Sequence, residues 1–138
     1  MGAMQRRKGQ AGEIELAGII RDLTGWDVKR RVRNNLGDDD LEGVPGWSVE
    51  SKRYAKATPA LIRGWWDQAV RQAGTSIPVL FFRENRSEWR AVWPLAVALR
   101  IQSADMWVGF EWTATTSIAA WAAVAREIDI DAQNNVSC

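Results

Sequence analysis

The chain has 138 residues, of which 46% are hydrophobic and 25% charged, as in a globular protein of one compact domain. It contains no histidine and a single cysteine, Cys138, which excludes serine–histidine catalysis, imidazole-held zinc and an intramolecular disulfide. Any metal ion must be held by oxygen ligands, which suits Mg²⁺ or Mn²⁺. We find no secretory signal and no transmembrane run, so we expect a cytoplasmic protein without a membrane partner. We expect one domain over residues 5–131, an expression remnant at 1–4 and a flexible tail at 132–138.

The net charge is only +1, but the charges are grouped along the chain. Basic residues cluster at 6–8, 29–33 and 52–56, and acidic residues cluster at 38–42. A basic first half around one acidic group is the pattern expected of a metal site that faces phosphates. Solvated surface charges explain the same pattern equally well.

The first half of the chain predicts one helix followed by three strands. Apolar residues that recur on one face predict the helix over residues 11–24. Apolar and charged residues alternate over 26–32, as in a half-buried strand. Two short strands are predicted at 40–44 and 47–52, on either side of the turn Pro45-Gly46.

The second half opens with a helix whose start is signalled by its residue types. Thr58 is the predicted N-cap and Pro59 the first helical residue, and the helix runs to Gly74. The continuous apolar run at 77–83 predicts a buried central strand, with 88–93 as its antiparallel partner. The last predicted elements are a strand and a helix, at 106–112 and 116–127. This order of elements predicts an α/β fold in which helices flank a mixed β-sheet.

Asp40, Glu50 and Lys52 form the constellation with the clearest chemistry. Glu50 and Lys52 are two residues apart on a strand and therefore share one face. Asp40 precedes the turn and Glu50 follows it, so a bent hairpin would bring both carboxylates to one Mg²⁺ ion. A lysine beside them can orient or deprotonate a water, or stabilise charge on a phosphate. This set suits phosphodiester hydrolysis; the alternative is an ordinary charge pair on an edge strand.

Residues 40–52, DLEGVPGWSVESK, resemble the D…(D/E)-x-K core of the PD-(D/E)XK nucleases. Asp39 stands where the family usually has proline, so Asp38, Asp39 and Asp40 are all candidates for the first carboxylate. Asp40 is preferred because Leu41 follows it, as in the usual entry to the strand. The resemblance implies a restriction-endonuclease-like fold and a Mg²⁺ or Mn²⁺ cofactor.

Residues 7–16, RKGQAGEIEL, are similar to the R-K-G-x-x-x-E-x-E-L opening of archaeal-type Holliday junction resolvases. In that family the first glutamate, Glu13 here, lies on the first helix and completes the metal site. On geometry alone, an acid that stabilises the helix start is as good an explanation. Glu15 is expected to point further round towards solvent. The implied catalytic residues are Glu13, Asp40, Glu50 and Lys52, with the three carboxylates as metal ligands.

Phage and prophage members of this group carry a similar G-V-P-G-W-S-x-E-x-K-R stretch, a W-W-x-Q-A helix and a P-V-L strand. The matching residues here are 43–53, 65–69 and 78–80. Gln68 is therefore a candidate accessory residue, and an ordinary helix-surface glutamine is the alternative. The resemblance covers residues 7–83 and implies a bacterial host that carries the phage, whereas residues 94–138 resemble no family we can name.

The resemblance also implies DNA as the partner. Arg7 and Lys8 match the family's basic arm, and other arginines are candidates for phosphate contacts, which position DNA without reading its sequence. The candidate DNA-binding residues are Arg7, Lys8, Arg30, Arg31, Arg33 and Arg53.

Junction resolution requires two symmetric nicks, so a twofold homodimer is expected, with a tryptophan-rich surface as its interface. We therefore expect a magnesium-dependent endonuclease that resolves four-way DNA junctions. One alternative is another nuclease on the same core, restriction-like or acting in repair or single-strand processing. A non-catalytic DNA-binding protein is the other.

Overall fold

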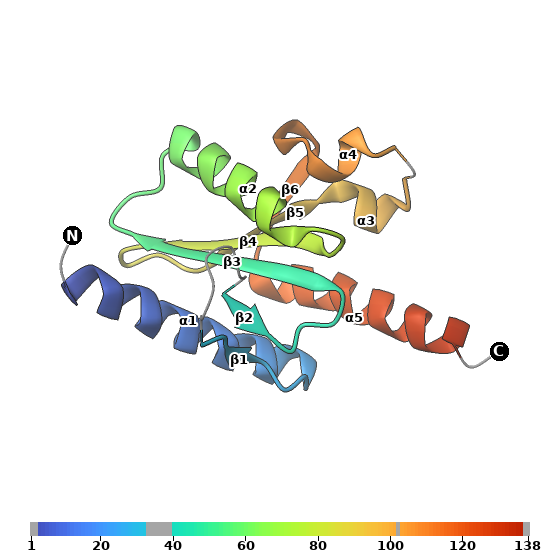
Figure 1. Ribbon diagram of the computed structural model, residues 1–138, viewed down its shortest axis with the longest axis horizontal. Coiled ribbons are helices and arrows are strands. Elements are labelled where there is room, and N and C mark those ends of the chain that lie inside the picture. The colour runs from blue at the N-terminus through green and yellow to red at the C-terminus, as the bar shows by residue number, and fades with distance from the viewer. Residues whose placement is uncertain (1–2, 33–39, 102, 137–138) are drawn as a thin grey trace.

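Six strands form one mixed sheet, in the spatial order β1-β2-β3-β4-β5-β6 (Figure 1). The strands are β1 (Lys29–Arg30), β2 (Leu41–Glu42), β3 (Trp47–Tyr54), β4 (Ile77–Glu84), β5 (Arg90–Pro94) and β6 (Thr113–Thr116). β3 and β4 are parallel, and all other neighbouring strands are antiparallel. The computed structural model describes the backbone of residues 3–32, 40–101 and 103–136, and the side chains of 9–32, 40–101 and 103–129.

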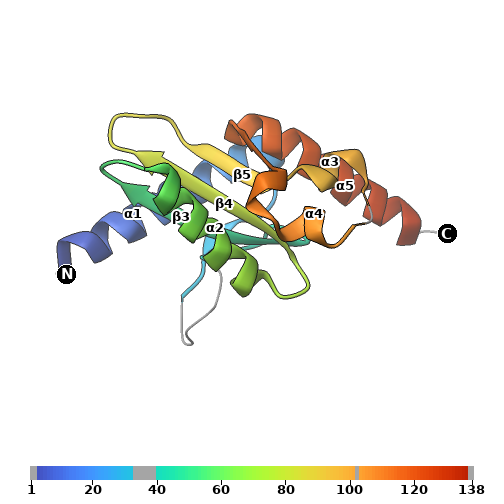
Figure 2. The same cartoon turned by 90° about the horizontal axis from the view of Figure 1, so that it is seen from above.

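Helices cover both faces of the sheet, as predicted (Figure 1). They are α1 (Ala3–Thr24), α2 (Pro59–Ala73), α3 (Leu95–Leu99), α4 (Asp105–Val108), the 3₁₀ helix η1 (Phe110–Trp112) and α5 (Ile118–Val136). α1 and α5 pack on one face and α2 packs on the other; Figure 2 shows α2 crossing over β3 and β4. No helix in the described part of the chain combines the length and the apolar character needed to cross a membrane.

Each face of the sheet has its own hydrophobic core. Under α1 and α5, Trp121 packs edge-on against Trp47 and Phe81, with ring centroids 5.4 and 5.0 Å away. Under α2, Leu80 and Phe82 of the sheet pack against Trp65, Trp66 and Ala69 of the helix. Alternate residues of β4 therefore belong to different cores, as strand geometry requires.

Tryptophan is mainly a core residue in this protein. Of the nine tryptophans, six are buried, namely Trp47, Trp65, Trp66, Trp89, Trp93 and Trp121. Trp112 is 42% exposed. The expected tryptophan-rich surface is therefore wrong, because most of these rings fill the space between sheet and helices.

Elements with strong local signals lie where they were predicted. Thr58 caps α2, since its Oγ1 accepts a hydrogen bond of 3.2 Å from the N–H of Leu61, and Pro59 is the first helical residue. Gly74 ends the helix with a positive φ of 58°, which glycine adopts without strain. The apolar run at 77–83 is β4, in the interior of the sheet.

Several other helices and strands have boundaries or types that differ from those predicted. Residues 106–112 form α4 and η1 instead of a strand, because periodicity cannot assign so short an apolar run. The strand in this region is β6, which pairs with β5. α5 extends to Val136, past the predicted end at 127 and into the expected tail, and α1 begins at Ala3 instead of 11. The strand predicted at 26–32 shrinks to β1.

Candidate metal and catalytic site

Asp40 is fixed to β3 on both sides of Glu50. Its main-chain N–H donates to the carbonyl of Val49 at 2.8 Å, and its Oδ2 accepts from the N–H of Ser51 at 2.7 Å. Val49 and Ser51 are the two chain neighbours of Glu50. The segments of Asp40 and Glu50 therefore lie next to each other, held by these hydrogen bonds, and the convergence of the two carboxylates on one ion stays a prediction.

A third strand supports Asp40 from the other side. The N–H of Arg31, just after β1, donates to the carbonyl of Asp40 at 3.0 Å. β1 pairs with β2 directly beyond this point, with Arg30 opposite Leu41. Asp40 is thus held between two segments, so its carboxylate has little freedom to move. Asp38 and Asp39, the other two candidates for this position, lie outside the described residues.

Lys52 contacts Glu50 directly. Its Nζ lies 3.2 Å from Oε1 of Glu50, and the Lys52 side chain is 20% exposed. The two residues share one face of β3, as the spacing predicted. In the parallel register Glu50 pairs with Leu80 and Lys52 with Phe82, so this is the face that α2 covers.

Among the side chains that the structure describes, these two carboxylates are among the few buried polar groups. Asp40 is 1% exposed and Glu50 is 3% exposed. Removing an ionised carboxylate from water costs several kcal/mol, and a nearby cation offsets that cost. Lys52 supplies one positive charge to Glu50. A divalent cation would supply two more, so burial of two acids on neighbouring segments fits a Mg²⁺ or Mn²⁺ site with oxygen ligands.

Glu13 is the third carboxylate that the resemblance implies as a metal ligand. It lies on α1, whose apolar residues pack on the face opposite to Glu50 and Lys52. Its Oε2 is 3.6 Å from Nε of Arg30, on β1. Among the described residues, no three acidic or cysteine side chains gather in a way that could hold a metal ion. The role of Glu13 as a third ligand stays a prediction.

Three of the candidate DNA-binding residues have described side chains. Two of them, Arg30 and Arg31, lie at the β1 edge of the sheet, and Arg53 lies on β3. Arg30 pairs with Glu13, and Arg31 has Nη1 3.6 Å from Oε2 of Glu42. Arg53 lies across α1 at Gly12, where an added Cβ would be 3.4 Å from its Cδ. The side chains of Arg7 and Lys8, and the whole of Arg33, lie outside the described residues.

Glu15 does not point to solvent as expected. Its Oε1 accepts a hydrogen bond of 2.7 Å from Nε1 of Trp89, and it forms an ion pair with Arg83. These contacts tie α1 to β4 and to the segment before β5. No local sequence pattern predicts this link, because the partners of Glu15 are 68 and 74 residues away along the chain.

Gln68, the accessory candidate, is half-buried on α2. Trp65, one turn earlier, packs against Tyr54 at the end of β3, with ring centroids 4.8 Å apart. Gln68 therefore lies on the helix that covers Glu50 and Lys52. The position suits a residue near the site, and its role stays a prediction.

Comparison with known proteins adds no family. No protein-family model matches the chain, and no curated protein and no solved structure matches it either.

Proposed function

We propose that this protein is a divalent-metal-dependent DNA endonuclease of the PD-(D/E)XK type, with a restriction-endonuclease-like fold and four-way junctions as its substrate. The observation that carries the proposal is the pairing of two buried carboxylates, with Asp40 bonded to both chain neighbours of Glu50. Lys52, in contact with Glu50, adds the basic group that the D…(D/E)-x-K pattern implies.

The three residues have two roles, the first of which belongs to the carboxylates. Asp40 and Glu50 would hold the ion, which, when bound, supplies Lewis-acid activation of the phosphoryl oxygen and of the attacking water. The main-chain N–H of Ser51 donates to the Asp40 carboxylate. This bond holds the carboxylate in one orientation before a metal ion binds. Burial of both carboxylates also keeps competing water away from them.

Lys52 is placed to handle a proton or a negative charge. An ammonium group has three donors, and Glu50 lies within reach of Nζ at 3.2 Å. The remaining donors are available to a phosphate oxygen or to the attacking water. The partial exposure of Lys52 allows a phosphate to approach it from outside, whereas the carboxylates lie deeper.

The choice of a junction as substrate rests on the resemblance of residues 7–16 to junction resolvases. The basic residues near the sheet edge support a partner that is read by its shape and phosphates. Two symmetric nicks require two active sites, so we propose that the protein acts as a homodimer.

The decisive experiment compares a labelled four-way junction with a linear duplex of matched sequence, in Mg²⁺ and then in EDTA. Wild type and Glu50→Ala are assayed in parallel. Paired nicks in the junction alone, lost in EDTA and in the variant, support junction resolution. Equal metal-dependent cutting of both substrates indicates a nuclease of broader substrate range. Absence of cutting with Mg²⁺ and with Mn²⁺ rejects the proposal.

A further inference from the structure

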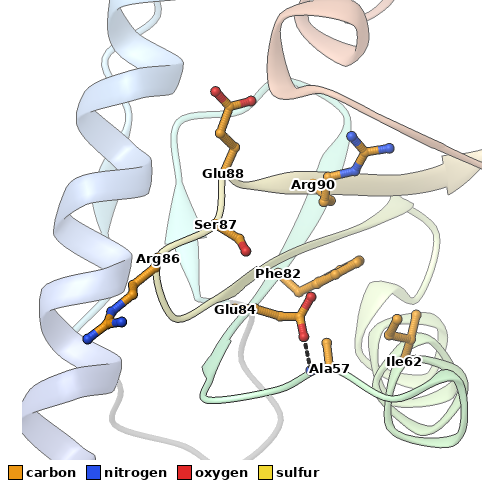
Figure 3. A pocket seen from close by; sticks show the side chains of 8 residues that line it. All are labelled: Ala57, Ile62, Phe82, Glu84, Arg86, Ser87, Glu88 and Arg90. Carbon is orange, nitrogen blue, oxygen red and sulfur yellow. Dashed lines mark hydrogen bonds between the residues drawn. The ribbon is translucent and has the colours of Figure 1, made fainter.

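A cavity lies at the outer end of the β4–β5 hairpin (Figure 3). It has a volume of about 540 Å³ and opens widely to solvent. The start of α2 forms one wall and the hairpin forms the other. The residues that line it are Ala57, Ile62, Phe82, Glu84, Arg86, Ser87, Glu88 and Arg90.

This cavity lies beside the candidate site, on the same face of the sheet. Lys52 pairs with Phe82 across β3 and β4, and Phe82 pairs with Arg90 across β4 and β5. Paired residues of a sheet share a face, and neighbouring strands are about 4.8 Å apart. Arg90 is therefore two strands away from Lys52 along one row, with Phe82 between them.

The two arginines of the cavity are available for a ligand. Arg86 and Arg90 are both exposed, and neither forms an ion pair with any residue whose side chain the structure describes. Within the described part of the chain, Glu84 forms no ion pair with either arginine; its Oε2 accepts a hydrogen bond of 2.9 Å from the N–H of Ala57, just before α2. In Figure 3, Glu84 turns towards Ala57, and Glu88 projects away from it. Arg90 lies on the Phe82 side of the hairpin, whereas the Arg86 side chain projects outward from the turn, at the rim of the cavity.

Arg86 occupies a backbone position that disfavours arginine. Its φ is 63°, in the left-handed region, where glycine is the residue of lowest cost. The turn is held by the Ser87 N–H to Glu84 carbonyl bond of 3.1 Å and by Nε of Arg83, which donates to the carbonyl of Ser87 at 2.8 Å. An arginine at such a position costs stability, which points to a use for its side chain.

We propose that this cavity, which we call the hairpin pocket, binds the sugar-phosphate backbone of the DNA through Arg86 and Arg90. The inference rests on the proposed function, and it adds the direction of the bound strand. The bound DNA strand runs from Lys52 past Phe82 towards β5 and the hairpin, and not towards β1. Contacts of this kind position the substrate and carry no sequence preference.

The test measures DNA binding with Ca²⁺ in place of Mg²⁺, by fluorescence anisotropy of a labelled junction over a range of salt concentrations. The variants are Arg86→Gly, Arg90→Gln and the double variant. Arg126→Gln, on α5 and away from the pocket, is the control. Each pocket variant is expected to weaken binding about three- to tenfold and to lower the salt slope by about one. Arg126→Gln is expected to leave both the DNA affinity and the salt slope unchanged.

Arg86→Gly separates an effect on DNA binding from an effect on folding, because DNA affinity and the urea midpoint are expected to change in different directions. Glycine relieves the backbone strain, so the urea midpoint of this variant stays the same or rises while DNA affinity falls. If the double variant binds with the affinity and salt slope of a DNA-binding wild type, the hairpin pocket is not part of the DNA site and the proposed function stands. If wild type itself binds no DNA, both proposals fail, and this is seen before any variant is made.

Discussion

The main-chain N–H of Ser51 donates a hydrogen bond of 2.7 Å to Oδ2 of Asp40, and this bond sets a buried carboxylate beside Glu50. The donor is a backbone group, so its position follows from the path of β3 and from no particular side chain. β3 is paired with strands on both sides and therefore moves little. The hydrogen bond to β3 restrains the Asp40 side chain in the same way.

Substitutions of Asp40 separate its structural bond from its charge. Asp40→Asn keeps an oxygen that can accept from Ser51, so we expect its unfolding free energy to stay within about 1 kcal/mol of wild type. Asp40→Ala leaves the Ser51 N–H without this acceptor and is expected to cost about 1–3 kcal/mol. Both variants should lose nicking activity. Urea unfolding checks the prediction, and equal destabilisation by the two variants would contradict it.

Metal binding should stabilise the folded protein. An ion that binds only the native state adds about 2.7 kcal/mol at a free concentration of 100 Kd, so Mn²⁺ should raise Tm relative to EDTA. Glu50→Gln removes a charged ligand and should abolish most of this rise. Glu127→Gln, on α5, is the matched control and should keep it. A Tm of wild type that does not respond to Mn²⁺ or Mg²⁺ would argue against a metal site here.

Lys52→Met should separate chemistry from metal binding. The variant keeps an unbranched stem but loses the ammonium group, so nicking is expected to fall by about a hundredfold or more. Both carboxylates remain, so the Mn²⁺-dependent rise in Tm should persist. Lys56→Met, an exposed lysine four residues further on, is the control and should cut at the wild-type rate. Wild-type nicking by Lys52→Met would remove Lys52 from the proposed mechanism.

Gly43 directly follows β2 and lies against the backbone of Asp27, just before β1, so a side chain there should be poorly tolerated. Its φ is +89°, and a Cβ would lie 2.2 Å from the carbonyl oxygen of Asp27. Gly43→Ala must therefore push the two segments apart, and we expect it to cost about 3 kcal/mol or more and to lower nicking.

Gly46→Ala is the matched control for this prediction. It has a similar φ of +82°, but nothing lies within 4 Å of an added Cβ. The expected cost is only the backbone strain, about 1–2 kcal/mol. Urea unfolding of both variants measures the difference, and equal costs would show that the close approach to Asp27 is not what constrains Gly43.

The sequence by itself determined the features that depend on near neighbours in the chain. Thr58 and Pro59 mark the start of α2 because capping involves residues three positions apart. The apolar run at 77–83 predicts an interior strand because both of its faces must be covered. Glu50 and Lys52 share a face because strands alternate with a period of two. In these cases the pattern and its physical cause lie in the same short segment.

The tertiary structure decided which of these segments meet. It placed Asp40 against Val49 and Ser51, paired Glu15 with Trp89 and Arg83, and paired Glu13 of α1 with Arg30 of β1. It also made residues 105–112 helical, because short apolar runs take the form that their neighbours pack best. Such contacts join residues far apart in the chain, and packing of the whole sheet selects them.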